Sequence, residues 1–532
     1  MTRHRPPAWL KTAVFYQIYP QSFYDANGDG IGDITGIIEK LDYLQSLGVT
    51  ALWLNPVFAS PFRDAGYDIS NFYQVAPRYG TNGDLARLFK LAHQRHMKVC
   101  LDLVAGHTSD QHPWFKASAQ PEPNRYTNWY IWTDSAWDST EPNVVRGFSE
   151  RDGGYLPNYF YFQPSLNYGY ANPDPGKKWQ LPVTHPAVRA VRQELKNIMR
   201  FWLDMGADGF RVDMANSLVR GDANGRGLRA LWLDYRSWLD RHYPEAVLIS
   251  EWGDPRHSIA SGFDIDFFLH FGEPAYQHLL GPANGDSKSR DKKRIFFNRR
   301  GTGNIRLFLD NYLPHYHATK RRGYIALPTG NHDFSRHSRW QEPEDLRIIY
   351  AMLFTMPGVP FILYGDEIGQ KFLEGLGSKE GSYSRAGTRA PMQWEKARNF
   401  GFSTAAKNKL YLPVNPITDA HNVAAQERNP ESLLNLTKRL LILRRQHPAL
   451  GNCGNLTPVC AKAGKYPFVY ERSYRQTRFW VAINPTEFTL RLKLPPLKSV
   501  MNLASEKADL ARQKTNSTLT MDPLSFGIFK IG

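Results

Sequence analysis

Gly209-Phe210-Arg211-Val212-Asp213-Met214-Ala215-Asn216 is the stretch of sequence from which both the fold and the chemistry of this chain can be worked out. A short apolar run ends here in a carboxylate, and an arginine stands two residues before it. Residues i and i+2 of a strand point to the same side, so Arg211 and Asp213 share one face. A neighbouring guanidinium favours the ionised form of an aspartate, which suits a nucleophile. Such a pair is more often a structural ion pair, so the rest of the chain decides its meaning.

Short apolar runs alternate with amphipathic stretches on both sides of this segment. The runs that we interpret as strands are 14–19, 51–54, 98–104, 209–213, 246–250, 263–269, 324–328 and 360–364. Apolar residues at helical spacing predict helices at 37–47, 85–96, 184–206, 228–242 and 433–447. Nearly continuous apolar strands that alternate with helices are typical of parallel sheets. Eight of them predict an α/β fold, a (β/α)8 TIM barrel.

Two parts of the chain break this pattern. Residues 106–180 are rich in Pro, Asn, Gly and aromatic residues and show no long helical period, which predicts an inserted subdomain after the third strand. In residues 451–532 apolar and polar residues alternate, which predicts a C-terminal antiparallel β-sandwich domain. The catalytic barrel is then expected to comprise residues 1–105 and 181–450.

The composition limits the classes of partner. The formal charge of +16 invites a nucleic-acid interpretation, but the basic residues are spread along the chain except for one cluster at 288–300. No recognition motif accompanies that cluster, so we interpret it as a solvated loop rather than a polyanion site. No stretch approaches the roughly 18 apolar residues of a membrane span. We therefore expect no nucleic-acid partner, no membrane partner, and a monomer or homodimer.

The cysteines and the N-terminus bear on the compartment. Cys100, Cys453 and Cys460 give neither a disulfide framework nor a CxxC metal pattern, and so low a count fits a reducing compartment. Cys100 lies in an apolar run and is expected to be a buried thiol. The first residues are not followed by an apolar segment of signal-peptide type. We expect a cytoplasmic protein.

Polar residues stand at the ends of several predicted strands, where a barrel of this type carries its catalytic groups. They are Asp68, Asp102, His107, Arg211, Asp213, Glu251, His332 and Asp333. Two carboxyl groups about 5 Å apart can cleave a glycosidic bond with retention, one as nucleophile and the other as acid. Asp213 fits the nucleophile, and Glu251, beside Ile249 and Trp252, fits an acid of raised pKa. Asp333 could bind sugar hydroxyls and stabilise the transition state.

Four motifs resemble those of the α-amylase superfamily of retaining α-glycosidases, glycoside hydrolase family 13. They are Asp102-Leu103-Val104-Ala105-Gly106-His107, Gly209-Phe210-Arg211-Val212-Asp213, Ile249-Ser250-Glu251-Trp252 and Asn331-His332-Asp333. The resemblance implies Asp213 as nucleophile, Glu251 as general acid/base and Asp333 as the third carboxylate. It also implies that His107, Arg211 and His332 bind the sugar whose bond is cleaved.

Within the superfamily the chain resembles the oligo-1,6-glucosidase and α-glucosidase branch. Residues 163–167 (QPSLN) are similar to its QPDLN motif, and 388–394 (TRAPMQW) to its ARTPMQW motif. The resemblance implies that the aspartate of Gly66-Tyr67-Asp68 pairs with an arginine near the second motif and caps the non-reducing end. The residues expected to bind substrate are Asp68, Tyr67, His107, Arg211, His332, Gln163, and Arg389 or, less favoured, Arg385.

The acidic segment Asp25-Ala26-Asn27-Gly28-Asp29-Gly30-Ile31-Gly32-Asp33 resembles an EF-hand loop, with oxygens at alternate positions and a glycine at the turn. Its twelfth position is Gly36, so the bidentate glutamate is missing. Relatives in this branch bind Ca²⁺ in this loop. We expect structural calcium at Asp25, Asn27, Asp29, Ile31 and Asp33, and no organic cofactor. A second calcium site, common in amylases, is not expected, because Gly106 replaces its asparagine ligand.

The function expected is that of a retaining, exo-acting α-glucosidase on short oligosaccharides or α-glucosides. The nearest alternative is a transglucosidase or isomerase with the same glycosyl-enzyme intermediate, similar to trehalose synthase or sucrose isomerase. A non-catalytic glycan-binding or partner protein is a third reading, disfavoured because all three carboxylates are present. Met214 stands where the branch tends to separate linkages and leaves the preferred linkage open, and Ser165, in place of the motif's aspartate, weakens an α-1,6 assignment.

Overall fold

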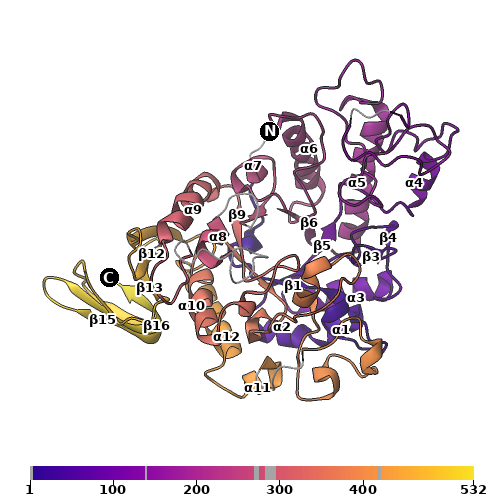
Figure 1. The fold of residues 1–532 in the computed structure, drawn as a ribbon. Coiled ribbons are helices and arrows are strands. Elements are labelled where there is room, and N and C mark those ends of the chain that lie inside the picture. The colour runs from indigo at the N-terminus through magenta and orange to yellow at the C-terminus, as the bar shows by residue number, and fades with distance from the viewer. Residues whose placement is uncertain (1–3, 138–140, 269–274, 282–294, 416–420) are drawn as a thin grey trace.

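The computed structural model describes residues 4–137, 141–268, 275–281, 295–415 and 421–532, and these form a closed barrel of parallel strands with two additions (Figure 1). In the order in which they pair, the barrel strands are β1 (Phe15–Ile18), β2 (Ala51–Leu54), β5 (Lys98–Leu103), β6 (Gly209–Val212), β7 (Val247–Ser250), β8 (Ile265–Phe267), β9 (Tyr324–Pro328) and β10 (Val359–Leu363). Each predicted strand overlaps one of them, so the predicted (β/α)8 barrel is confirmed.

The interior of the barrel is filled by side chains. The rings of Phe15 and Phe361 stack 4.4 Å apart, and Trp53 packs against both Phe361 and Phe267. Cys100 is fully buried among these residues, as its apolar run predicted. Because this core leaves no channel, a ligand can bind only where loops add walls to one end of the barrel.

The helices surround the barrel and bury one face each against it. They are α1 (Ile34–Glu39), α2 (Leu41–Leu47), α3 (Asn82–Gln94), α5 (Pro186–Met205), α6 (Arg226–His242), α7 (Pro255–Ala260), α8 (Ala275–Leu280), α9 (Ile305–Thr319), α10 (Pro343–Leu353), α11 (Val423–Glu427) and α12 (Leu433–Gln446). Helix α5 shows why they form. The side chain of His185 caps it, Pro186 occupies its first turn, and Gly206 ends it in a positive φ of 121°. Its buried face includes Val188, Leu195 and Trp202.

The segment between β5 and α5 is poor in regular structure. In its described part the one helix is α4 (Pro113–Ser118), and isolated bridges such as His107 to Ser165 hold its loops together. Between β2 and α3, the strands β3 (Phe58–Ala59) and β4 (Asn71–Val75) form a small antiparallel ribbon. These two segments add walls above the carboxyl ends of the strands.

The C-terminal strands form one antiparallel sheet of six strands, which corrects the expected sandwich of two sheets. The strands are β11 (Asn455–Cys460), β12 (Phe468–Tyr474), β13 (Thr477–Asn484), β14 (Leu490–Leu494), β15 (Val500–Arg512) and β16 (Ser517–Ile531). Strand β16 is long enough to pair with β15 along one edge and with both β13 and β14 along the other. One face, with Phe479 and Val481, packs on the barrel core, and the other, with Trp480, forms its own cluster.

Two features bear on the expected partners. Residues 288–294 of the basic cluster lie outside the described residues, and in its remaining part Arg299 pairs with Asp345, with Nε 2.9 Å from Oδ1. Among the helices of the described residues, none has the length and apolar character needed to cross a bilayer.

Candidate active site

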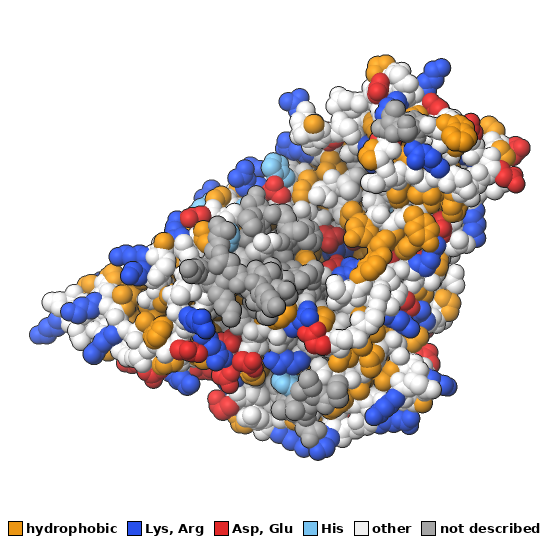
Figure 2. All heavy atoms as spheres, in the orientation of Figure 1, with side chains coloured by type: hydrophobic (Ala, Val, Ile, Leu, Met, Phe, Trp, Pro, Cys, Tyr) orange, Lys and Arg blue, Asp and Glu red, His pale blue; other side chains and the backbone are white. Residues whose placement is uncertain are grey.

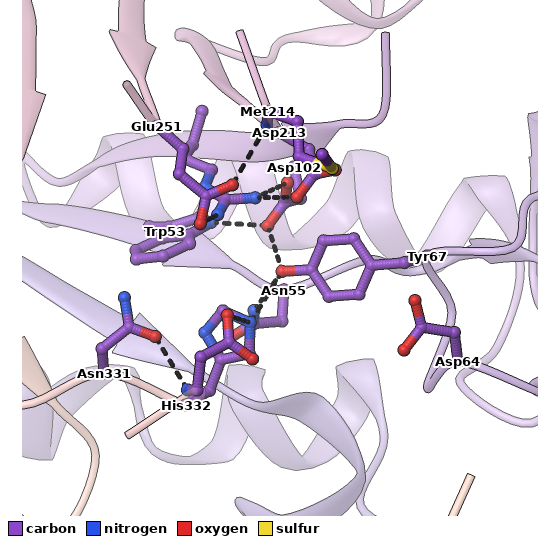
Figure 3. Close-up of polar contacts among 12 residues, drawn as sticks. Trp53, Asn55, Asp64, Tyr67, Asp102, Asp213, Met214, Glu251, Asn331 and His332 are labelled. Atoms are coloured by element: carbon purple, nitrogen blue, oxygen red, sulfur yellow. Dashed lines mark hydrogen bonds and ion pairs between the residues drawn. The ribbon is translucent and has the colours of Figure 1, made fainter. Parts of the chain in front are cut away.

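Three carboxylates meet on one arginine at the carboxyl ends of neighbouring strands (Figure 3). Arg211 Nη1 lies 2.8 Å from Asp102 Oδ1 and 2.9 Å from Asp213 Oδ1. Its Nη2 lies 2.9 Å from Glu251 Oε1. Strand register explains the meeting, because Asp102 on β5 stands opposite Arg211 on β6. The predicted convergence of Asp213 and Glu251 on one site is therefore observed.

The glycine that opens the decisive stretch lets β6 approach β7 closely. Gly209 has φ of 149°, and a Cβ placed on it would lie 2.3 Å from the carbonyl oxygen of Val247. Any other residue would push the two strands apart. This close approach fixes the distance between the strand that carries Asp213 and the strand that carries Glu251.

One guanidinium is too little positive charge for three buried carboxylates. Burial raises the pKa of Asp213 to about 7, although Arg211 acts in the opposite direction. Burial likewise raises the pKa of Glu251 to about 7 and the pKa of Asp102 to about 6. The expectation that Arg211 holds Asp213 ionised was too simple, because the sequence did not show that the arginine is shared. Near neutral pH the cluster retains a proton.

The position of Glu251 is fixed by the residue after the nucleophile. The backbone N–H of Met214 donates to Glu251 Oε2 at 3.0 Å. Met214 has φ of 43°, a left-handed conformation that is rare for a bulky residue and that turns this N–H toward the glutamate. Glu251 therefore has one partner at each oxygen, an ion pair with Arg211 at Oε1 and a hydrogen bond from Met214 at Oε2.

Asp333 has the opposite electrostatic setting. Its Oδ1 lies 2.5 Å from Arg385 Nη1 and 3.0 Å from Arg389 Nη2, and its Oδ2 lies 3.2 Å from His332 Nε2. Burial would raise the pKa of Asp333, but the charges of Arg385 and Arg389, together with the Nε2–H of His332 beside its Oδ2, hold it well below its usual range. This carboxylate is ionised at all working pH values.

A hydrogen-bonded network connects His332 to the arginine cluster. The Tyr67 hydroxyl lies 3.0 Å from Asp102 Oδ2 and 2.9 Å from His332 Nε2, while Gln17 Nε2 donates to His332 Nδ1 at 2.8 Å. Because an amide nitrogen only donates, the imidazole proton of His332 sits on Nε2. Burial lowers the pKa of His332 well below its ordinary value, so the ring is neutral.

His107 enters the site from the inserted segment. Its Nε2 lies 3.1 Å from the carbonyl oxygen of Tyr67, and Asn158 Nδ2 donates to its Nδ1 at 3.0 Å. Burial lowers the pKa of His107 to about 4, so this ring is neutral as well. The amide of Asn158 lies 2.7 Å from where a Cβ of Gly106 would stand, which is why this position has no side chain.

A cavity of about 370 Å³ lies above the cluster. It is lined by Asp64, Tyr67, His107, Tyr159, Gln163, Asp213, Met214, Asn216, Glu251, Trp252, Asp333 and Arg385. Figure 2 shows this face with red and blue side chains in a hollow bordered by hydrophobic ones. Ligand pockets usually measure about 300–1,000 Å³, so this one suits a ligand of one or two sugar rings.

Asp68 does not line this cavity, which corrects its expected role. It is fully buried, and its carboxylate accepts bonds from the backbone N–H of Arg63 at 3.0 Å, the N–H of Asp64 at 3.1 Å and the Ser60 hydroxyl at 2.9 Å. These bonds close the turn that carries Asp64 into the cavity. Asp64 accepts a bond of 2.7 Å from Gln163 Nε2, and burial raises its pKa to about 6. Sequence reasoning missed Asp64.

The two candidate arginines also differ from expectation in which of them lines the cavity. Arg385, the less favoured candidate, lines the cavity. Arg389 is 1% exposed and lies behind Asp333, where its Nε donates to the carbonyl oxygen of His332 at 3.0 Å. Asp64 and Arg385 therefore line the cavity in place of Asp68 and Arg389, Arg385 forms its ion pair with Asp333, and Arg389 holds Asp333 in place.

The acidic loop is closed by its own backbone. Asp25 and Asp33 accept hydrogen bonds of 2.6–3.3 Å from backbone N–H groups of this segment. Asn27 accepts from the N–H of Asp29, and Asp29 from that of Ile31. Among the described residues no three acidic, His or Cys side chains are grouped closely enough to hold a metal ion. These carboxylates alone do not fit calcium, and calcium binding here stays a prediction.

Comparison with known proteins places this site in a family. The family model of the alpha amylase catalytic domain matches residues 17–452. The chain belongs to the α-amylase family. It is an enzyme of glycoside hydrolase family 13, whose members act on glucosides.

Relatives within the α-amylase family carry different reaction names. The chain is 32% identical to trehalose synthase/amylase TreS of Mycobacterium tuberculosis, over 83% of this chain and 76% of that protein. It is 30% identical to oligo-1,6-glucosidase of Parageobacillus thermoglucosidasius, over 98% of this chain and 99% of the relative. The solved trehalulose synthase MutB of Pseudomonas mesoacidophila has a TM-score of 0.81 at 28% identity, over 98% of this chain and 99% of MutB.

Proposed function

We propose that the protein is a retaining, exo-acting α-glucosidase that removes terminal α-linked glucose from short α-glucosides. The observation that carries this proposal is the placement of Asp213 and Glu251 on adjacent nitrogens of one guanidinium, inside a cavity whose wall also holds Asp64 and Arg385. The shared guanidinium keeps the two carboxyl groups close, as a retaining mechanism requires. The charged side chains of Asp64 and Arg385 in the wall suit recognition of the hydroxyl groups of a chain end.

The reaction needs Asp213 ionised and Glu251 protonated. Ionised Asp213 attacks C1 of the glucosyl unit, and protonated Glu251 gives its proton to the leaving glycosidic oxygen. Asp213 and Glu251 both have a pKa raised to about 7, so near neutral pH they share a proton, and the reactive form is the one in which Glu251 carries it. Glu251, now ionised, takes a proton from water, whose oxygen attacks C1 and releases Asp213. Two inversions leave the product in the α configuration.

Asp333 supports the same reaction without transferring a proton. Its permanent negative charge, secured by Arg385 and Arg389, faces the cavity in which positive charge develops on the sugar. His107 and His332 are neutral, so they add no charge that would oppose it. The arrangement therefore supplies nucleophile, acid and electrostatic stabiliser from three strand ends.

An isomerase is the second candidate, and the relatives favour it. Trehalose synthase/amylase TreS and trehalulose synthase MutB are both similar to this chain along most of its length. Such a reaction uses the same glucosyl-enzyme, but a sugar hydroxyl replaces water as the attacking group. The choice depends on how well the first leaving group is retained in the cavity.

The test is product analysis with maltose, isomaltose and sucrose. The first proposal predicts glucose from maltose or isomaltose and retention of the α configuration in the first-formed product. If the main product is trehalose from maltose, or an isomer of sucrose from sucrose, the protein is an isomerase and the hydrolase proposal is wrong. Asp213→Asn should abolish either reaction, while Asp240→Asn, far from the cavity, serves as the matched carboxylate control.

A further inference from the structure

Asp266 is a buried carboxylate close to Glu251 that the proposed reaction does not use. It is the middle residue of β8 and has no exposed surface. In the strand register it stands opposite Ser250, which is the last residue of β7 and the chain neighbour of Glu251. Asp266 itself does not line the cavity. Any effect that it has on the chemistry must therefore pass through the residues that it holds.

One oxygen of Asp266 holds both chain neighbours of Glu251. Its Oδ1 accepts the hydroxyl of Ser250 at 2.7 Å and the backbone N–H of Trp252 at 3.2 Å. Backbone pairing between β7 and β8 ends at Ser250, so the ladder offers no partner to the N–H of Trp252. The carboxylate supplies the acceptor that a backbone carbonyl would supply if the pairing continued.

Glu251 is fixed by other groups on the side of β6. Its backbone N–H donates to the carbonyl oxygen of Val212 at 3.0 Å, and its carbonyl oxygen accepts the N–H of Ala215 at 3.2 Å. Its carboxylate contacts Arg211 and the N–H of Met214. These four partners lie on β6 or on the turn that follows it. The carboxylate on β8 holds the same strand end from the opposite side.

The anchor also fixes part of the cavity wall. Trp252 lines the cavity together with Glu251, and its ring packs edge-to-face against Phe263 with the ring centres 6.3 Å apart. Phe263 is fully buried, so this ring rests on a fixed surface while Asp266 holds the backbone. A shift of this loop would move the acid and the wall together.

A carboxylate at this position costs stability. Burial raises the pKa of Asp266 to about 7, and the groups that act in the opposite direction, Ser250, Ser258 and the backbone of Trp252 and Gly253, include no base. Its Oδ2 is buried and has no hydrogen-bond partner of normal geometry among the described residues. Burying an unpaired carboxylate lowers the free energy of unfolding. What this residue contributes is therefore the pair of bonds at Oδ1.

We propose that Asp266 is a positioning residue for Glu251, which it keeps within reach of the leaving glycosidic oxygen through the two neighbours that it holds. The inference rests on the proposed function, in which Glu251 is the acid. A proton donor must come within hydrogen-bond distance of the atom that it protonates. A misplacement of about 1 Å can lower the rate about 100-fold, so the support behind the acid matters as much as the acid itself.

This role can be separated from a general structural one, because only some leaving groups need the acid. When a disaccharide is cleaved, the bond from C1 to oxygen breaks as Asp213 bonds to C1, and the proton of Glu251 moves to the departing oxygen. Fluoride leaves α-glucosyl fluoride as a stable anion and needs no proton. Loss of positioning should slow the disaccharide and spare the fluoride, whereas general damage to the cavity should slow both.

The test compares kcat/KM for maltose or isomaltose, whichever the protein consumes faster, with kcat/KM for α-glucosyl fluoride. In Asp266→Ala the ratio of disaccharide to fluoride should fall about tenfold, because the acid is displaced. Asp266→Asn keeps an oxygen that accepts both bonds, so its ratio should stay within about twofold. Ser250→Ala removes one of the two bonds and should lower the ratio about threefold.

Asp264→Asn is the matched control. Asp264 is equally buried and lies two residues earlier, at the amino end of the barrel, where it pairs with Arg236. This change should lower the stability and leave the ratio unchanged, so it reveals any effect of destabilisation alone. If Asp266→Ala does not fold, the fall in Ser250→Ala against this control decides the proposal.

Each contrary result has its own meaning. An unchanged ratio in Asp266→Ala, or an equal fall for both substrates, overturns the positioning role. A fall in Asp266→Asn as large as in Asp266→Ala assigns the effect to charge and overturns the role of the two bonds. If the unaltered protein consumes neither substrate, the proposed function fails, and the inference fails with it. If the products are isomers, the hydrolase proposal alone fails, because kcat/KM reports the steps before water or a sugar attacks the glucosyl-enzyme.

Discussion

Two arginine-centred clusters lie at opposite ends of the barrel and differ in their balance of charge. At the carboxyl ends, Arg211 alone serves Asp102, Asp213 and Glu251. At the amino ends, Arg236 of α6 contacts Asp264 at 3.1 Å, just before β8, and Asp240 at 2.8 Å.

The amino-end cluster has a second base and a different purpose. His4 lies 2.7 Å from Asp264 and 2.9 Å from Asp240, so two carboxylates face an arginine and an imidazole. In the cluster of Arg211 the carboxylates outnumber the bases, and burial raises the pKa of Asp213 to about 7. The comparison teaches that an arginine–aspartate pair is structural where each carboxylate has a basic partner of its own, and chemical where carboxylates outnumber the bases.

The largest expected effect separates the two clusters by activity. Asp213→Asn should lower kcat for an aryl α-glucoside by about 10⁴-fold or more, because it removes the nucleophile. Asp264→Asn, the matched change at the other cluster, should leave kcat of the folded protein within a few-fold. Steady-state kinetics of both variants checks this. Residual activity above one hundredth in Asp213→Asn would break the comparison.

The next prediction concerns stability, for which the larger loss is expected at the amino-end cluster. Asp264→Asn removes a carboxylate that holds buried Arg236 and also accepts the backbone N–H of Leu248 at 2.9 Å. Breaking a buried ion pair on one side lowers the free energy of unfolding by about 3 kcal/mol. Denaturant unfolding near pH 7 measures it. A loss no larger than that of Asp42→Asn, a surface carboxylate paired with Arg95, would contradict the structural role.

Asp213→Asn should instead stabilise the protein, and only at higher pH. The pKa of Asp213 rises from its ordinary value near 3.8 to about 7 on folding, so the folded state holds the proton more tightly. Stability is therefore full below about pH 4 and is lost as the pH rises through about 7. The variant should gain roughly 2 kcal/mol at pH 8 and nothing at pH 4. Equal gains at both values would show that charge is not the cause.

The smallest effect concerns a third acidic group, which has no arginine. If calcium binds at Asp25 to Asp33, a free Ca²⁺ concentration tenfold above Kd should raise the free energy of unfolding by about 1.4 kcal/mol. Asp29→Ala should abolish that gain. Thermal unfolding with Ca²⁺ or with a chelator measures it, with Mg²⁺ as the matched control. An unfolding midpoint that does not change with Ca²⁺ would show that calcium does not bind in this loop.

The barrel was predictable because its signals are local and repeated. Strands such as 51–54 and 247–250 are buried throughout, so their apolar runs need no tertiary knowledge to be recognised. The carboxyl ends of parallel strands share one side, so the approach of Asp213 and Glu251 follows from chain order. The sharing of Arg211 did not follow, because it depends on register between β5, β6 and β7.

The errors fall in irregular loops. Asp64 and Asp68 stand four residues apart, and which of them enters the cavity is decided by a turn in which Phe62 and Ala65 adopt positive φ. Neither Phe nor Ala favours positive φ, so this conformation cannot be inferred from the residue types. Arg385 and Arg389 lie in one 3-10 helix, Tyr383–Arg389, and again only the folded loop shows which one reaches the cavity. The length of β16, which joins the C-terminal strands into one sheet, was likewise hidden by its irregular alternation.

The central claim is that Asp213 becomes covalently bound to the sugar. A fluorinated α-glucosyl donor whose glucosyl-enzyme hydrolyses slowly should trap that state, and peptide mass spectrometry then locates the label. The account predicts one added fluoroglucosyl unit on the peptide that contains Asp213, and none in Asp213→Ala. A label on another carboxylate, or turnover of the donor with the β anomer as first product, would contradict it.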